Sequence, residues 1–121
     1  MTRRPAGAAR AATATLVALR PSDLTALQSN ASRACALLKA LSNEVRLMLV
    51  CQLSEGEKSV GELQDFVKLS QSAVSQHLAL LREHKLVATR RNGQSVYYRL
   101  SSGDAAAVIK TLHDQFCVKK R

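Results

Sequence analysis

The stretch from Leu69 to Val87, L-S-Q-S-A-V-S-Q-H-L-A-L-L-R-E-H-K-L-V, decides how this chain folds. Ser70 is a residue type that caps helix N-termini, and the fourteen residues after it contain neither Gly nor Pro. Val74, Leu78 and Leu81 recur at i, i+4 and i+7, the spacing of one helix face. The stretch therefore predicts an amphipathic helix whose apolar side faces a core.

The opposite face of this helix is short, polar and uncharged, with Ser72, Ser75, Gln76 and Ala79 on it. Ser and Gln side chains can hydrogen-bond to base edges, and a small residue such as Ala79 lets a helix lie deep in the major groove. A solvated helix face more usually carries Glu and Lys. We interpret the helix as a DNA recognition helix, and a plain polar helix face is the alternative.

Three helices are predicted upstream of it, over residues Leu24–Ala40, Glu44–Leu53 and Ser59–Val67. The second is apolar around most of its circumference, which is typical of a central core helix. The third begins with the capping-box pattern S-V-G-E. A helix, a two-residue turn and a helix with a readable face make up a helix-turn-helix.

After Lys85 the apolar period changes from 3.6 to 2. The segments V-A-T-R-R and S-V-Y-Y-R-L are predicted strands, joined by Asn92-Gly93, a strong hairpin signal. A hairpin directly after a recognition helix is typical of a wing. Arg90 and Arg91 at its tip suit contacts with phosphate or the minor groove; in the alternative they only protect an edge strand from pairing.

A last helix is predicted from about Asp104 to Phe116, and we expect little core to be left for it to cover. We interpret its apolar stripe, with part of the first helix, as a dimer interface made of Leu24, Leu27, Val108, Leu112 and Phe116. A homodimer would offer one recognition helix to each half-site of a palindromic operator in double-stranded DNA.

The charge balance points to the same partner. The formal net charge is +9, which favours a polyanion such as nucleic acid. Residues 1–21 are rich in Ala, Arg and Thr, lack acids, and are predicted to form a disordered basic tail; an organelle transit peptide is the alternative. Residues 22–121 then form one domain, which binds DNA and dimerises. Aromatic residues make up only 3%, which argues against a single-strand binder built on stacking.

Several classes of protein are not expected. The longest apolar run, Leu47 to Cys51, is too short to cross a bilayer, so no membrane partner is expected. Three cysteines without a secretory apolar region indicate a reducing compartment, the cytoplasm. They are free thiols, metal ligands or redox switches. Neither a cofactor nor an enzyme is expected, since the chain lacks a phosphate-cradling Gly motif and a nucleophile–base–acid set.

From about Ala31 to Cys117 the sequence resembles the ArsR/SmtB family of winged-helix repressors. The likeness rests on A-L-L-K-A-L-S-N-E-V-R-L-M-L-V-C, S-V-G-E-L, L-S-Q-S-A-V-S-Q-H-L-A-L-L-R and the strand Y-Y-R-L. It implies a mainly α fold with a small β-hairpin, the order α-α-α-α-β-β-α, a homodimer, and an operator-bound repressor released by an inducer.

The metal-site patterns of that family are broken in this chain. Metal-sensing members carry C-V-C where Ser59-Val60-Gly61 stands here. Another subgroup uses two carboxylate/His pairs on the last helix, whereas Asp104 is followed by Ala106 and a single His113. No metal site is therefore expected, although a metal sensor with His113 and Cys117 among its ligands stays a second hypothesis.

The contexts L-V-C-Q-L and H-D-Q-F-C resemble the BigR/SqrR/HlyU group, whose two cysteines sense persulfides, other reactive sulfur species or oxidants. This resemblance implies that Cys51 and Cys117 are the sensor thiols; without it, Cys51 would be read as a small core residue. Cys35 matches neither position and is expected to be an inert buried thiol. His113 either favours the Cys117 thiolate from one turn away or faces solvent.

The leading hypothesis is a DNA-binding repressor of the ArsR type that senses reactive sulfur species through a Cys51–Cys117 switch. General oxidant or metal response, and nonspecific architectural DNA binding, are the alternatives. The residues predicted to contact DNA are Gln71, Ser72, Ser75, Gln76 and His77 on the recognition helix and Arg90, Arg91 and Asn92 on the wing.

Overall fold

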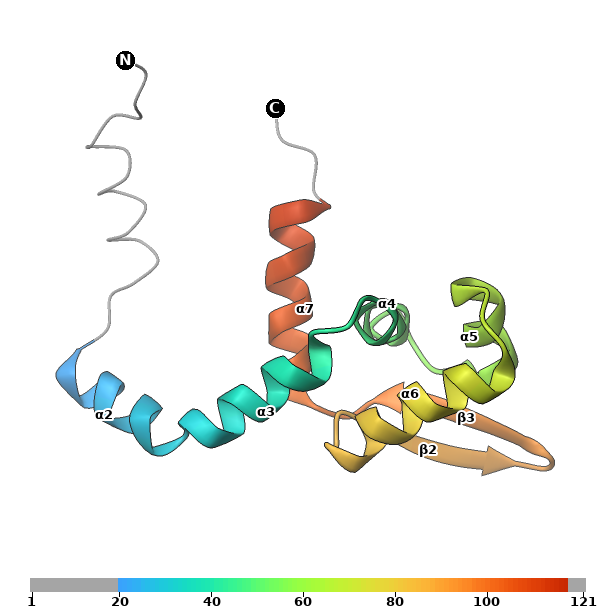
Figure 1. The fold of residues 1–121 in the computed structure, drawn as a ribbon, viewed down its shortest axis with the longest axis horizontal. Coiled ribbons are helices and arrows are strands. Elements are labelled where there is room, and N and C mark those ends of the chain that lie inside the picture. The colour runs from blue at the N-terminus through green and yellow to red at the C-terminus, as the bar shows by residue number, and fades with distance from the viewer. Residues whose placement is uncertain (1–19, 118–121) are drawn as a thin grey trace, which may run out of the picture. The chain divides into compact units, whose positions relative to one another are not determined.

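The computed structural model describes residues 20–117 (Figure 1). The predicted tail, residues 1–21, lies outside the described residues apart from its last two. The chain divides into two compact units, residues 1–34 and residues 35–121. The elements that the structure describes are α2 (Pro21–Ser29), α3 (Ala31–Leu41), α4 (Glu44–Leu53), β1 (Lys58–Ser59), α5 (Val60–Val67), α6 (Gln71–Glu83), β2 (Val87–Asn92), β3 (Ser95–Leu100) and α7 (Gly103–Phe116).

The first helix of the prediction is two helices. The prediction of one helix over Leu24–Ala40 is wrong because Asn30 ends α2 and begins α3. The Asn30 side chain donates a hydrogen bond to the carbonyl of Ala26 at 2.9 Å, and its own carbonyl accepts from Ala34 N at 3.0 Å. An Asn side chain that bonds to nearby backbone in this way competes with the continuous helical ladder.

The three central helices begin at the residues that the sequence indicated. Asn43 caps α4 by accepting a hydrogen bond from Arg46 N at 3.0 Å. Ser59 and Glu62 form the predicted capping box at the start of α5, with bonds of 2.8 and 3.1 Å. Ser70 caps α6 by accepting from Ala73 N at 3.1 Å. These caps satisfy backbone N–H groups that the first turn of a helix leaves without partners.

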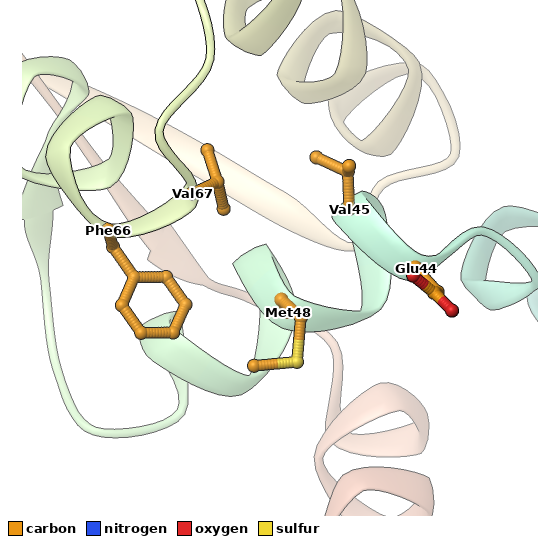
Figure 2. Close-up of a pocket in the computed structure, with 5 residues that line it drawn as sticks. All are labelled: Glu44, Val45, Met48, Phe66 and Val67. Atoms are coloured by element: carbon orange, nitrogen blue, oxygen red, sulfur yellow. The ribbon is translucent and has the colours of Figure 1, made fainter.

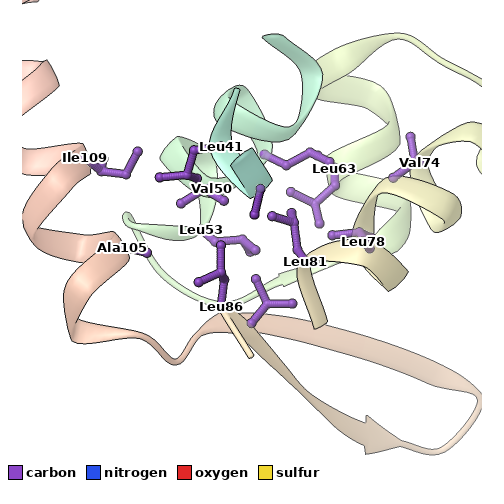
Figure 3. Packing of buried hydrophobic residues seen from close by; sticks show 13 residues of the cluster. Leu41, Val50, Leu53, Leu63, Val74, Leu78, Leu81, Leu86, Ala105 and Ile109 are labelled. Carbon is purple, nitrogen blue, oxygen red and sulfur yellow. The ribbon is translucent and has the colours of Figure 1, made fainter. Parts of the chain in front are cut away.

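The core is aliphatic and joins α4, α5, α6 and α7 to the base of the sheet (Figure 3). Its largest fully buried side chains are Leu49, Leu63, Leu78, Leu81, Val50 and Val74. All buried side chains of the described residues are hydrophobic. The apolar stripe of α6 that the sequence predicted is thus confirmed as part of the core.

The sheet has one strand more than the predicted hairpin. It is antiparallel with the order β1-β3-β2, because Lys58 and Ser59 pair with Tyr98 and Tyr97 of β3. A two-residue strand has no period of its own in the sequence. The described order therefore carries five helices before the hairpin instead of four, with β1 inserted between α4 and α5.

The hairpin turn lies one residue further along than predicted. Asn92 is still paired, opposite Ser95, so the two-residue loop is Gly93-Gln94 instead of Asn92-Gly93. Gly93 has a φ of 65°, a left-handed conformation that glycine adopts at little cost.

The last helix contributes more to the core than the sequence indicated. Ala105 and Ile109 of α7 are buried, and Val108 and Leu112 are half-buried against the same cluster. The prediction that little core remained for this helix is therefore wrong, whereas Phe116 at its end is 81% exposed. No helix within residues 20–117 is both long and apolar enough to cross a membrane.

Candidate DNA-binding surface and thiol pair

Helix α6 has the two faces that a recognition helix requires. Val74, Leu78 and Leu81 are fully buried. On the other side, the exposed residues are Gln71, Ser72, Ser75, Gln76 and Ala79, while His77 is half-buried at the margin. The first turn of α6 contains no acidic residue. This face can therefore approach a polyanion without carboxylate repulsion in its first turn.

Two left-handed lysines set the ends of α6. Lys68, with a φ of 59°, ends α5 and makes the short turn into α6. Lys85, with a φ of 63°, follows α6; its N–H donates to Arg82 O at 2.9 Å while Leu86 N donates to Leu81 O at 2.9 Å. This pair of bonds is a Schellman motif, which ends the helix and directs the chain into β2.

The wing places its two arginines on opposite faces of the sheet, because neighbouring residues of a strand alternate. Arg90 pairs across the strands with Tyr97, and Arg91 with Val96. Arg90 Nη2 lies 2.6 Å from Glu57 Oε1, and its guanidinium carbon lies 4.8 Å from the centre of the Tyr97 ring. Arg91 is exposed and makes no ion pair within the described part of the chain.

Charges on the wing alter the pKa of the acid beside it. The hydrogen bonds from Arg90 hold the pKa of Glu57 below its ordinary value, and the charges of Arg90 and Arg99 act in the same direction. The pKa of Arg90 is raised in turn, chiefly by the Glu57 hydrogen bonds. Both groups therefore stay ionised at neutral pH.

The two predicted sensor thiols are electrostatically coupled. Cys51 is half-buried on α4, and Cys117 is exposed at the C-terminal cap of α7. Burial raises the pKa of the Cys51 thiol, and the charge of Cys117 raises it further. All three cysteines are free thiols. Cys35 is exposed on α3, so the prediction that it is buried is wrong.

His113 faces solvent, the second of the two sequence interpretations. Its side chain is largely exposed, and Nδ1 lies 3.9 Å from Asp114 Oδ1. Asp114 also accepts a hydrogen bond from Lys110 at 2.9 Å. In residues 20–117, no three His, Cys, Asp or Glu side chains are grouped so that they could hold a metal ion.

The predicted dimer residues differ in exposure. Leu24 and Leu27 of α2 are half-exposed, and Phe116 is more exposed than either, whereas Val108 and Leu112 already pack against the core.

One surface feature was missed by the sequence interpretation. A shallow pocket of about 260 Å³ lies between α4 and α5, lined by Glu44, Val45, Met48, Phe66 and Val67 (Figure 2). Met48 and Phe66 are large apolar side chains left exposed there. In the sequence, these two residues could have been found as apolar residues on the side of a helix that faces away from the core. The pocket carries one carboxylate and no base or thiol.

Comparison with known proteins agrees with the family resemblance seen in the sequence. Residues 43–89 match the family described as "Bacterial regulatory protein, arsR family". The chain is 48% identical over 97 residues to the "Transcriptional activator HlyU" of Vibrio cholerae, covering 80% of this chain and 90% of that protein. It is 44% identical over 95 residues to the "Biofilm growth-associated repressor" of Xylella fastidiosa, covering 78% and 83%.

Solved structures agree with the sequence relatives. The crystal structure of the repressor BigR from Xylella fastidiosa superposes with a TM-score of 0.75 at 42% identity, covering 84% of this chain and 100% of that chain. Reduced HlyU from Vibrio cholerae superposes with a TM-score of 0.73 at 49% identity, covering 76% and 97%. A helix-turn-helix followed by a wing is thus the architecture of its relatives also.

Proposed function

The chain belongs to the ArsR family of bacterial regulatory proteins, and from that premise we propose that it represses transcription and senses reactive sulfur species through Cys51 and Cys117. As a member of this family it is a DNA-binding transcriptional regulator and not an enzyme. One of the two relatives is described as an activator and the other as a repressor. Repression is proposed because a bound dimer blocks a promoter without any further partner.

Base recognition is assigned to the exposed face of α6. Ser72, Ser75 and Gln76 lie at its centre and would contact base edges, while Gln71 and His77 lie at the margin of the footprint. On the wing, Arg91 and Asn92 would contact the sugar-phosphate backbone or the minor groove. A homodimer would place two such faces one helical turn apart on a palindromic operator.

Dimerisation is assigned to the apolar side chains that the fold leaves uncovered. Leu24, Leu27 and Phe116 are among the large apolar side chains that are exposed, and Val108 and Leu112 would contribute their solvent-facing edges. Large exposed apolar side chains mark contact surfaces when several share one interface.

The first reaction is assigned to Cys117. The thiolate is the nucleophile, and the raised pKa of Cys51 keeps that thiol protonated at neutral pH. The exposed Cys117 thiolate would attack the sulfane sulfur of a polysulfide, breaking the donor S–S bond and expelling the rest of the donor as a thiolate or hydropolysulfide. The product is a persulfide on Cys117.

Cys51 would then resolve the persulfide. The Cys51 thiol gives up its proton to solvent as its sulfur attacks Cys117 Sγ, forms the Cys51–Cys117 disulfide, and expels hydrosulfide. The sulfane sulfur is reduced to sulfide as the two thiols are oxidised, so no other oxidant is needed. A second polysulfide would convert Cys51 to a persulfide as well. The outer sulfur of the Cys117 persulfide then attacks Cys51 Sγ, expels hydrosulfide and leaves a link that carries one added sulfur. Because α7 packs on α4, either link would shift one helix against the other and change the spacing of the two recognition helices.

The observation that carries this proposal is the packing of α7, which Cys117 caps, against α4, which contains Cys51; the charge of Cys117 also raises the pKa of the Cys51 thiol. Intact-protein mass spectrometry with peptide mapping tests it, after anaerobic reduction and then exposure to polysulfide or to hydrogen peroxide. A Cys51–Cys117 link that forms after polysulfide and not after hydrogen peroxide is the expected result, either as a disulfide or with added sulfur mass. The same disulfide after both reagents would indicate a general redox switch, and no link would overturn the proposal.

A functional assay completes the test. Cys51→Ser and Cys117→Ser should bind the operator like the wild type but stay bound after polysulfide. Cys35→Ser is the matched control and should be released normally, since its thiol lies on α3 outside the pair. Normal release of either of the first two variants would contradict a two-thiol switch.

A further inference from the structure

The inference concerns the wing and rests on the DNA binding proposed above. Arg90 and Glu57 approach each other across the whole sheet. Glu57 directly precedes β1, Arg90 lies on β2, and β3 runs between them. The guanidinium donates from Nε to both carboxylate oxygens at 3.1 Å and from Nη2 to Oε1 at 2.6 Å. Such a forked pair fixes geometry as well as charge.

Tyr97 supplies the surface beneath this ion pair. It is the cross-strand neighbour of Arg90 and also the partner of Ser59 in β1. The guanidinium carbon lies 4.8 Å from its ring centre, within the range of a cation–π contact. Glu57, Arg90 and Tyr97 therefore tie the hairpin to the segment that leads into α5, the first helix of the helix-turn-helix.

The ion pair also uses the donors that a phosphate would need. Arg90 Nε and Nη2 are both bonded to Glu57, and the carboxylate neutralises the guanidinium charge. Arg91, its neighbour in the strand, lies on the opposite face of the sheet and is exposed. The positive charge of Arg90 is thus neutralised by a carboxylate, whereas the positive charge of Arg91 is open to solvent.

We propose that Glu57, Arg90 and Tyr97 form a clamp that sets the position of the wing, and that Arg91 is the arginine of the wing that binds a DNA phosphate. Arg90 and Glu57 are then positioning residues. Their loss moves the wing without removing a phosphate contact, whereas loss of Arg91 removes one.

The salt dependence of operator affinity distinguishes these roles, because each phosphate contact contributes about one to the slope of log affinity against log salt. The double variant Glu57→Gln with Arg90→Gln keeps the net charge of the wing. It should bind the operator several-fold more weakly at every salt concentration, with the wild-type slope. The matched variant Arg91→Gln should lower the slope by about one per protomer.

The opposite pattern would overturn the proposal. If the double variant lowers the slope by about one per protomer and Arg91→Gln does not, Arg90 is the phosphate contact. Double-variant affinity equal to wild type would show that the pair does not position the wing. Circular dichroism of each variant checks folding, and Arg91→Gln, which leaves the clamp intact, keeps the phosphate assignment testable if the double variant does not fold. If the wild type itself fails to prefer an operator over random duplex, the proposed function fails instead.

Discussion

The Cys51 thiol has a raised pKa because it is partly buried on α4 and because the charge of Cys117, at the end of α7, opposes a second negative charge nearby. The effect of the Cys117 charge exists only in the folded chain, where the two thiols are brought together. It makes the reactivity of Cys51 depend on whether Cys117 is ionised.

Cys117→Ser should therefore make Cys51 more acidic. Replacing the thiol removes one of the two causes of the raised pKa, so the pH profile of Cys51 alkylation should move to lower pH. Burial remains, so the midpoint should stay above the ordinary cysteine value. Iodoacetamide labelling across pH 7–10, followed by mass spectrometry, measures the pH profile of Cys51 alkylation.

Cys35→Ser serves as the control in that experiment and should leave the Cys51 profile in place. A Cys51 profile that is identical in wild type and Cys117→Ser would show that the two thiols do not interact in solution.

Arg46→Ala should destabilise the fold by roughly 1.5–3 kcal/mol, the value of hydrogen bonds from a charged group. Arg46 Nε donates to Ala40 O at 2.7 Å and Nη2 to Lys39 O at 3.2 Å, so it caps the end of α3 from α4. Urea unfolding followed by circular dichroism measures the change. Arg91→Ala, on the exposed wing, should stay within about 0.5 kcal/mol of wild type, and equal effects of the two would contradict the capping role.

Lys85→Gly should leave stability unchanged or raise it by up to about 1 kcal/mol, because glycine adopts the left-handed conformation of this position without the cost of a Cβ. The gain is limited by the greater freedom of glycine in the unfolded chain. Lys39→Gly, inside the last turn of α3, is the matched control and should cost about 0.5–1 kcal/mol. Thermal unfolding compares the two; a clear loss at Lys85 would mean that its side chain stabilises the turn.

Glu62→Gln should reduce the acid sensitivity of folding. Hydrogen bonds from the Ser59 backbone and side chain lower the pKa of Glu62, so the folded chain binds fewer protons at this group than the unfolded chain. The stabilisation is complete above the ordinary carboxyl pKa and is lost as pH falls through the lower folded value. Between about pH 5 and 3 the wild type should therefore lose more stability than the variant.

Urea midpoints at several pH values provide the measurement for Glu62. Glu83→Gln, which removes the same charge from the end of α6 outside any capping box, is the control. Parallel acid profiles for wild type and Glu62→Gln would exclude the capping box as a source of acid sensitivity.

Much of the helical framework could be predicted because its signals are local. Val74, Leu78 and Leu81 repeat at helical spacing, and Ser59 and Ser70 cap helices through backbone groups three residues away. The break at Asn30 was missed because an Asn in a helical pattern either continues the helix or ends it, depending on which hydrogen bond its side chain makes.

By itself, the sequence determined the winged helix-turn-helix, the buried and exposed faces of α6, and the family, since periodicity, caps and turns act within a few residues. Only the tertiary structure decided which distant groups interact: Lys58 and Ser59 became a strand beside Tyr97 and Tyr98, and Arg90 was paired with Glu57. The same packing coupled Cys51 to Cys117. These interactions depend on distances that the core fixes between elements remote in the chain, and no local pattern encodes them.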